Sequence, residues 1–262
     1  MNRIRREPPP FRRVTVQATR ALSPWMTRVT LAGPELVGLA IEDPAASVRL
    51  LVPDGSQLVM PDWTGNEFLL PDGRRPALRT LTPRRADPDA GELDVDVVIH
   101  EGGVLSEWTT HVEPGEDAAI SGPGRGYVID PSVDSYVLAG DETAIPALSQ
   151  LLERLPHSAT LAVHVEIARA DARLELPEHP NAAIAWHVLN ATEQPGDAMV
   201  AAVLREPLTG NVMVWAAGEA AAVQRIRREL FTARGFPRAR ATVRGYWKFG
   251  RRADESAGDD ES

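Results

Sequence analysis

Five arginines in the first half of the chain have the type and spacing of an anion-binding site. Arg74, Arg75, Arg79, Arg84 and Arg85 fall within twelve residues of a chain whose net charge is −9. A planar guanidinium suits bidentate contact with a phosphate or carboxylate. An acidic protein that binds an anion has reason to concentrate positive charge locally. The cluster therefore indicates either an anion site or a loop whose arginines face water.

A glycine-containing turn offers a second candidate anion site. It lies within His100-Glu101-Gly102-Gly103-Val104-Leu105-Ser106-Glu107-Trp108, directly after a region of alternating apolar residues. Glycines let a backbone approach a ligand closely, and the free N–H groups at the start of a short helix attract phosphate. The same segment would also suit an ordinary glycine turn that leads into a helix.

Two later segments share one design. In the segment from Tyr136 to Ala147 a buried strand ends, Gly140 turns the chain, and a helix begins with Thr143 as the expected N-cap. The segment Trp215-Ala216-Ala217-Gly218-Glu219-Ala220 repeats this arrangement. Ligands of open parallel sheets bind at the carboxyl ends of the strands. Two such loops from one sheet edge would frame a nucleotide-binding site.

The elements that must position these segments fall into two halves. In the first half we expect short strands at residues 11–19, 26–31, 47–52, 92–100 and 118–121. Leu93, Val95, Val97 and Ile99 alternate with other residues, which is the period of a half-buried strand. Many short strands with little helix between them predict a small antiparallel Greek-key barrel or sandwich.

The second half alternates strands with helices. We expect strands at 135–139, 161–167, 182–189, 212–216 and 241–247, with helices at about 145–155, 197–205 and 219–234. This order predicts a parallel-sheet α/β nucleotide-binding domain. The expected organisation is an irregular N-terminus at 1–10, a β-barrel at 11–126, a linker at 127–134, an α/β domain at 135–250 and a disordered acidic tail at 251–262.

The composition excludes several kinds of site. The chain has no cysteine, which excludes disulfides, thiolate metal sites and cysteine nucleophiles. Its six histidines contain no i, i+4 pair, so we expect no intrinsic metal centre. Redox chemistry would then need a bound organic cofactor. The negative net charge disfavours nucleic-acid binding.

The sequence also bears on location. No apolar run approaches the roughly 20 residues that span a bilayer. The first ten residues, which are partly basic, lack the apolar stretch that follows in a secretory signal. We therefore expect a cytoplasmic protein with no segment inserted into a membrane.

The motifs, in this order, resemble those of the siderophore-interacting protein family, whose members are FAD-dependent ferric-siderophore reductases of the ferredoxin-reductase-like superfamily. Arg79-Thr80-Leu81-Thr82-Pro83-Arg84 is similar to the family's Arg-x-Tyr-Thr-x-Arg. The resemblance implies that Arg79 pairs with a flavin phosphate, that Thr82 lies near flavin N5, and that position 81 lies against the isoalloxazine ring. Leu81 departs from the pattern, because the family has a tyrosine there.

The other motifs extend the resemblance over residues 12 to 250. The segment from His100 to Trp108 is similar to the family's His-Gly…Gly-Pro-Ala-Ser-x-Trp, which implies that residues 103–106 hold the flavin pyrophosphate. Tyr136 to Ala147 matches Leu-Ala-Gly-Asp-Glu-Thr-Ala-Ile/Leu-Pro-Ala, and Gly245-Tyr246-Trp247-Lys248 matches the family's terminal motif. The implied cofactor-binding residues are Arg79, Thr80, Leu81, Thr82, His100, Gly102, Gly103, Val104, Leu105, Ser106, Asp141, Glu142, Thr143, Ala144, Gly218 and Glu219. The implied substrate-binding residues are Trp247, Lys248 and Arg251.

The resemblance implies a cytoplasmic reductase in which NADH or NADPH reduces FAD and FAD reduces the iron of a ferric siderophore. In such a mechanism the flavin carries the chemistry, so no protein side chain acts as a catalytic acid, base or nucleophile. Two alternatives remain: another NAD(P)H flavin reductase, such as the reductase component of an oxygenase, or a flavin-less module that binds a chelate. The sequence leaves open which siderophore is used, whether NADH or NADPH is the donor, and the oligomeric state.

Overall fold

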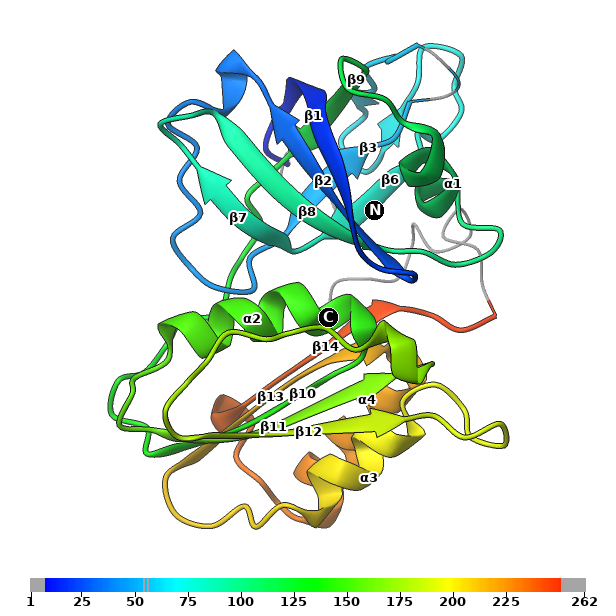
Figure 1. Ribbon diagram of the computed structural model, residues 1–262. Coiled ribbons are helices and arrows are strands. Elements are labelled where there is room, and N and C mark those ends of the chain that lie inside the picture. Colours follow the sequence, from blue (N-terminus) through cyan, green and yellow to red (C-terminus); the bar gives the residue numbers. More distant parts are fainter. Residues whose placement is uncertain (1–7, 54, 56, 251–262) are drawn as a thin grey trace. The chain divides into compact units, whose positions relative to one another are not determined.

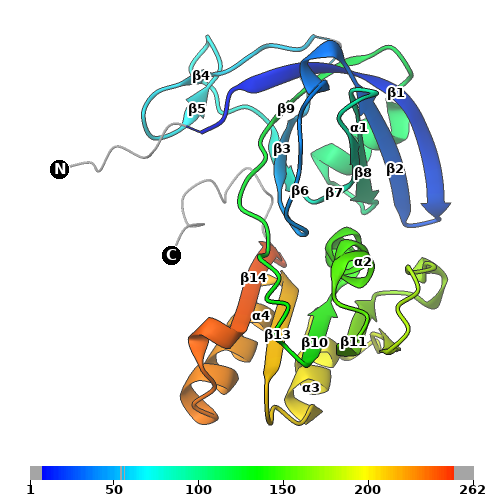
Figure 2. The same ribbon diagram turned by 90° about the vertical axis from the view of Figure 1, so that its left-hand side faces the viewer.

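The chain forms two compact units, shown in Figures 1 and 2. The computed structural model describes residues 8–53, 55 and 57–250. The chain passes from the first unit to the second between Tyr127 and Val128, and the short segment Ser23–Trp25 groups with the second unit. The expected acidic tail, most of the expected irregular N-terminus, and Arg251 lie outside the described residues.

The first unit is built on a curled seven-stranded sheet (Figure 2). The strand order is β6-β3-β9-β1-β2-β8-β7, and the pairs β1–β9, β2–β8, β3–β6, β3–β9 and β7–β8 are antiparallel. The strands are β1 (Phe11–Ser23), β2 (Met26–Ala32), β3 (Val48–Leu51), β6 (Leu78–Leu81), β7 (Pro83–Asp87), β8 (Glu92–Val98) and β9 (Asp117–Ser121). A two-stranded ribbon of β4 (Asp62–Trp63) and β5 (Phe68–Leu69), and helix α1 (Val104–His111), complete the unit.

Alternation along β8 creates two different faces. Leu93, Val95 and Val97 are at most 1% exposed and pack in one core cluster with Val29 and Leu31 of β2. Burial of each such side chain contributes about 1.5–3 kcal/mol. The opposite face of β8 carries two carboxylates that are also buried, although the alternation predicted a solvated face there. Arg28 of β2 lies 2.7 Å from Asp96 and Arg85 of β7 lies 3.2 Å from Asp94, so each buried carboxylate is paired with an arginine of a neighbouring strand.

The second unit is a five-stranded parallel sheet with helices on both faces. The strand order is β12-β11-β10-β13-β14. Figure 1 shows α2 on one face and α3 and α4 on the other. The strands are β10 (Ser135–Gly140), β11 (Thr160–Ile167), β12 (Ala182–Val188), β13 (Val212–Glu219) and β14 (Ala241–Trp247), and the helices are α2 (Ile145–Arg154), α3 (Asp197–Arg205) and α4 (Ala220–Arg228).

The topology of this sheet fixes where a ligand can bind. From β10 the chain moves outward through β11 and β12, and it then returns to the other side of β10 with β13 and β14. The order therefore reverses between β10 and its neighbour β13, where Gly140 lies opposite Ala217. Loops at such a reversal diverge and leave room for a ligand at the carboxyl ends of the strands.

The predicted fold class is confirmed: an antiparallel half-barrel is followed by a parallel α/β sheet. Helix α3 and strand β14 have the predicted bounds. The predicted helix over 219–234 is regular only to Arg228, and it continues as a π-helical turn over Glu229–Ala233. The ribbon of β4 and β5 was not predicted, because strands of two residues carry no measurable period. None of the helices in the described ranges is long and apolar enough to cross a membrane.

Candidate functional site

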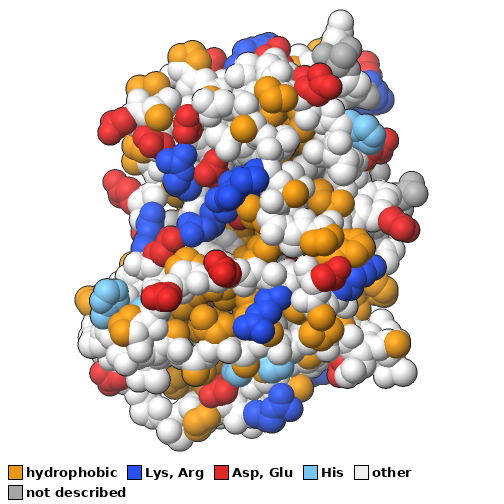
Figure 3. Space-filling model, viewed as in Figure 1, with side chains coloured by type: hydrophobic (Ala, Val, Ile, Leu, Met, Phe, Trp, Pro, Cys, Tyr) orange, Lys and Arg blue, Asp and Glu red, His pale blue; other side chains and the backbone are white. Residues whose placement is uncertain are grey.

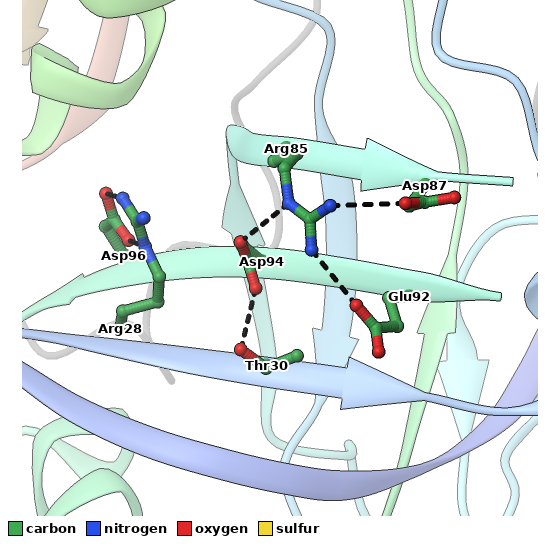
Figure 4. Close-up of polar contacts among 7 residues, drawn as sticks. All are labelled: Arg28, Thr30, Arg85, Asp87, Glu92, Asp94 and Asp96. Atoms are coloured by element: carbon green, nitrogen blue, oxygen red, sulfur yellow. Dashed lines mark hydrogen bonds and ion pairs between the residues drawn. The ribbon is translucent and has the colours of Figure 1, made fainter. Parts of the chain in front are cut away.

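The arginine cluster of the first unit is mostly paired with carboxylates. Arg74 lies 2.7 Å from Asp72, and Arg75 lies 2.7 Å from Glu67. On the face of this unit that Figure 3 shows, Lys and Arg side chains have Asp or Glu side chains beside them. Arg85 also binds three carboxylates (Figure 4). The five arginines therefore do not form one shared anion site, and three of them have clear structural partners.

Arg79 and Leu81 lie on one face of β6, as the strand period predicts. Leu50 lies opposite Arg79 and Val48 lies opposite Leu81 in the pairing with β3. Leu81 is half-buried and packs against the core cluster of the first unit. An aliphatic side chain at this position therefore serves the core of the barrel. Thr82, at the corner between β6 and β7, is 7% exposed.

The turn into α1 is held together by Ser106. The Ser106 hydroxyl donates to the Val98 carbonyl oxygen at 3.2 Å and accepts from the His100 N–H at 3.1 Å. The end of β8 is thereby fixed to the first turn of α1. Because this hydroxyl already has both partners, a ligand at the helix start would meet the backbone N–H of Ser106 rather than its side chain.

Glycines shape the same turn. Gly102 has a φ of +71°, which favours glycine. The His100 ring lies so close to Gly103 that a Cβ atom at position 103 would overlap it. Gly103 is the N-cap of α1 and provides no side-chain hydrogen bond to the helix. The first N–H groups of α1 therefore lack a side-chain cap and suit an anionic ligand.

Asp141 connects three separate chain segments at the carboxyl edge of the second sheet. Its Oδ1 accepts from the backbone N–H of Thr143 at 2.9 Å and from the Thr143 hydroxyl at 2.5 Å. Its Oδ2 accepts from the Glu219 N–H at 2.9 Å and from the indole Nε1 of Trp247 at 2.7 Å. Burial raises the pKa of this carboxyl, and the four hydrogen bonds oppose that rise.

This geometry corrects one expectation. Thr143 is not the N-cap of the turn; Asp141 is the cap of the short 3-10 helix Glu142–Ala144, and Thr143 donates to it. Local sequence could not separate the two residues, because Asp and Thr are both favoured caps. Ala144, the last residue of that turn, is fully buried.

Glu219 makes the second connection at this edge. Its Oε2 accepts from the Ala222 N–H at 2.8 Å and so caps α4, and its Oε1 accepts from the Phe249 N–H at 3.2 Å. Glu219 is 3% exposed. A Cβ atom at Gly218 would overlap Asp141 Oδ2, so only glycine allows the loops after β10 and β13 to approach this closely. The structure thus brings together the predicted residues of both loops.

Glu142 connects the loop after β10 to the loop after β11. Its Oε1 accepts from the Ala168 N–H at 3.0 Å, and burial raises the pKa of its carboxyl. Within the same unit, Asp171 accepts a 2.9 Å hydrogen bond from the Trp25 indole, and the Arg169 guanidinium lies 3.9 Å from the centre of the Trp25 ring. Arg169 and Asp171, which follow β11, therefore both contact Trp25.

The end of β14 presents aromatic and basic side chains. The rings of Trp247 and Phe249 meet edge to face with centroids 6.4 Å apart. Phe249 is 59% exposed, and Lys248 is also exposed. The hydrogen bonds to Asp141 and Glu219 hold this segment at the carboxyl edge. Arg251, the third predicted substrate contact, lies outside the described residues.

Sequence reasoning missed a histidine pair in the second unit. His164 of β11 and His187 of β12 approach within 3.2 Å between Nδ1 and Nε2, and the other nitrogen of His164 lies 3.0 Å from Glu206. His164 lies opposite Ala185 and Glu166 lies opposite His187, so the two imidazoles approach diagonally across β11 and β12, and only the alignment of these strands brings them together. Within the described ranges no group of three or more His, Asp or Glu side chains could hold a metal ion.

Comparison with known proteins assigns both units to one family. Residues 15–127 match the siderophore-interacting FAD-binding domain, and residues 133–250 match the siderophore-interacting protein family. The chain is 34% identical over 259 residues to the uncharacterized protein Rv2895c of Mycobacterium tuberculosis, covering 92% of each chain. It is 27% identical to the ferric vibriobactin reductase ViuB of Vibrio cholerae, covering 86% of this chain and 85% of that protein.

Comparison with solved structures supports the same family assignment. The crystal structure of a siderophore utilization protein from T. fusca matches with a TM-score of 0.82 and 35% identity, covering 94% of this chain and 95% of that one. A ferredoxin reductase in carbazole 1,9a-dioxygenase, at 12% identity and a TM-score of 0.64, covers 90% of this chain and 69% of that one and shares the fold alone. The expected resemblance is confirmed, and the chain belongs to the siderophore-interacting protein family, with an FAD-binding domain followed by a ferredoxin-reductase-like α/β domain.

Proposed function

We propose that this protein is an FAD-dependent NAD(P)H:ferric-siderophore reductase that releases iron as Fe(II) in the cytoplasm. Membership of the family supports FAD binding and a siderophore ligand. The relationship to ferric vibriobactin reductases supports the reductive reaction. The observation in this chain that carries the proposal is the start of α1, where glycines and uncapped N–H groups suit the pyrophosphate of FAD.

The first unit has the groups that FAD requires. Arg79 on β6 would pair with a flavin phosphate, and the N–H groups of Gly103, Val104, Leu105 and Ser106 would hold the pyrophosphate. Thr80, Leu81 and Thr82 would follow the flavin along β6 and its end. His100 and Gly102 would shape the turn, because the imidazole fills the space over Gly103.

The second unit would bind the nicotinamide donor, NADH or NADPH, at the carboxyl edge of its sheet. The carboxylates of Asp141 and Glu219 already accept internal hydrogen bonds, so their role would be to position the loops. The backbone of Glu142, Thr143 and Ala144 on one side and Gly218 on the other would frame the ligand. FAD held by the first unit would supply the conversion between a two-electron hydride donor and one-electron reduction of ferric iron.

The C-terminal segment would contact the substrate. A ferric siderophore is often anionic, and the exposed ammonium of Lys248, followed in sequence by Arg251, would attract it. Trp247 and Phe249 offer apolar surface beside that charge. Siderophore ligands prefer the harder ferric ion, so reduction weakens the chelate and frees the iron. This mechanism requires no side chain that donates or removes a proton.

An absorption spectrum of the purified protein, with and without added FAD, is the first test. Flavin bands that remain after gel filtration would support the proposal. Anaerobic NADH or NADPH should then bleach them, and the faster donor is the physiological one. A protein that stays colourless after incubation with FAD would favour a chelate-binding module. Faster reduction of free flavin than of any ferric chelate would favour another flavin reductase.

A further inference from the structure

A β-bulge lies at the end of the candidate flavin-binding strand. Strand β7 pairs with β8 so that Pro83 lies opposite Val95 and Arg85 lies opposite Asp94. Two steps along β7 therefore match one step along β8, and Arg84 is the extra residue. Bulges bend a strand and redirect a side chain, and they are frequent beside functional sites.

The bulge is required by two consecutive arginines. In a regular ladder, Arg84 would lie opposite Asp94 and Arg85 would lie opposite Leu93, which belongs to the core. A guanidinium in that core would lose its hydration without gaining a partner. In the observed register Ala86 lies opposite Leu93 and packs against the core, and Arg85 lies on the polar face.

Ion pairs to β8 hold β7 in this register (Figure 4). The Arg85 guanidinium lies 3.2 Å from Asp94, 3.0 Å from Glu92 and 3.3 Å from Asp87. The other oxygen of Asp94 accepts a 2.7 Å hydrogen bond from the Thr30 hydroxyl of β2. Because the Asp94 side chain is only 8% exposed, this contact is screened less than a surface pair. Three strands are therefore tied together beside the bulge.

The position of Arg84 along the chain separates its role from that of Arg79. Arg79 lies in β6, which pairs with β3, and Arg84 lies in β7, which pairs with β8, so the two arginines belong to different strands on either side of the corner at Thr82. Arg84 lies two residues beyond Thr82, which the resemblance to the family implies is near flavin N5. Arg84 is half-buried at this end of the strand.

We propose that Arg84 places a positive charge beside the flavin ring and that Arg85 is the positioning residue that aims it. This inference rests on the proposed function, because it requires FAD to lie along β6. A cation beside the ring favours the reduced flavin, which carries more negative charge, and so raises the reduction potential of bound FAD. Arg85 would act only through the bulge, since its own guanidinium is occupied by carboxylates.

A double-mutant cycle tests the assignment. The reduction potential of bound FAD is measured in the wild type, in Arg84→Gln, in Arg85→Gln and in the double variant. We expect each single variant to lower the ratio of reduced to oxidised FAD at fixed potential about tenfold, which is about 30 mV for a two-electron couple. The double variant should have the same potential as Arg84→Gln, because the guanidinium that Arg85 would position is already absent from that variant.

Further variants make the result decisive. Arg85→Lys keeps a cation near Asp94 and should restore most of the potential, and Thr30→Val should lower it by less than Arg85→Gln. Arg74→Gln removes an exposed ion pair in the same cluster and should change nothing. An Arg85→Gln effect that is absent, or that adds fully to Arg84→Gln, would overturn the inference while leaving the proposed function intact. A wild type that binds no FAD would instead overturn the proposed function.

Discussion

The indole Nε1 of Trp247 donates a 2.7 Å hydrogen bond to Oδ2 of Asp141, a residue 106 positions earlier in the chain. The same oxygen accepts from the backbone N–H of Glu219 at 2.9 Å. One buried carboxylate thus connects the ends of β10, β13 and β14. Three motifs that are far apart in the sequence meet on this side chain, which makes Asp141 the organising residue of the carboxyl edge.

Asp141→Asn should therefore destabilise the second unit. The amide has the shape of the carboxylate, but its NH₂ group would face two donors and leave them unsatisfied. We expect a loss of about 2–4 kcal/mol in the free energy of unfolding. Urea denaturation, followed by circular dichroism, measures it. An unchanged midpoint would show that this hydrogen-bond cluster contributes nothing to stability.

Trp247→Phe separates the indole N–H from the ring. Asp141 keeps three of its four hydrogen bonds in this variant, so the expected loss is smaller, about 1 kcal/mol. Trp63→Phe is the matched control, because no hydrogen bond from the indole of this half-buried tryptophan to a protein group is seen among the described residues. If both variants lose equal stability, ring size rather than the hydrogen bond to Asp141 is responsible.

The close contact between His100 and Gly103 predicts a rescue experiment. Gly103→Ala adds a Cβ atom where the imidazole lies, which should displace the turn and weaken FAD binding at least tenfold. His100→Ala in the same chain removes the ring and should recover much of that affinity. Equilibrium titration with FAD measures both. A double variant that binds FAD no better than Gly103→Ala would mean that the clash is not the cause.

Leu81→Tyr tests the departure from the family pattern. An aromatic ring that reaches the isoalloxazine would add about 0.5–1.5 kcal/mol of stacking, which is a two- to tenfold gain in FAD affinity. Leu78→Tyr, at the start of the same strand, is the control. Because Leu81 also packs against the core, the stability of both variants is measured alongside FAD binding. Weaker FAD binding with unchanged stability would show that this position does not face the flavin.

The paired histidines predict acid sensitivity in the second unit. Burial, then the charges of His164 and Arg205, lower the pKa of His187. The unfolded chain therefore takes up this proton more readily than the folded one. The contribution of neutral His187 to the free energy of unfolding is complete above the ordinary histidine pKa of about 6.5. It is lost as the pH falls through the lowered pKa of the folded protein.

Other groups of this unit act in the opposite direction. Burial raises the pKa values of Asp141, Glu142 and Glu166. Their contribution to the free energy of unfolding is therefore complete below the pKa of a carboxyl in the unfolded chain, and it is lost as the pH rises through the raised values. Because these two effects oppose each other, the pH dependence of stability is compared between the wild type and single variants. The wild type should lose more stability than His187→Gln between pH 7 and about pH 5. His111→Gln, on an exposed side chain of α1, should follow the wild type; parallel curves for all three proteins would contradict the assignment.

Much of the architecture could be predicted because it is encoded locally. The alternation of Leu93, Val95 and Val97 predicted β8, and the apolar residues of β10 and α2 predicted the start of the α/β domain. The segment containing Asp141 and the one containing Glu219 were each recognisable as a strand that ends at a glycine turn. Adjacency of parallel strands then follows from topology, which brings both to one edge.

The remaining features depend on contacts between distant residues. Nothing near Asp141 in the sequence indicates that Trp247 will donate to it, and nothing near Arg84 indicates a bulge, which arises from the register against Asp94. The pairing of His164 with His187 likewise depends on the alignment of β11 with β12. Such contacts are decided by packing, which a periodic pattern does not record.

A single-turnover experiment tests the central claim most directly. FAD-loaded protein is reduced anaerobically with NAD(P)H, freed of excess donor, and mixed with a ferric siderophore and a ferrous-specific dye. The account predicts that the flavin absorbance returns while one ferrous ion is trapped for each electron that the flavin held. Flavin that stays reduced, with no trapped iron for any hydroxamate or catecholate siderophore, would contradict it.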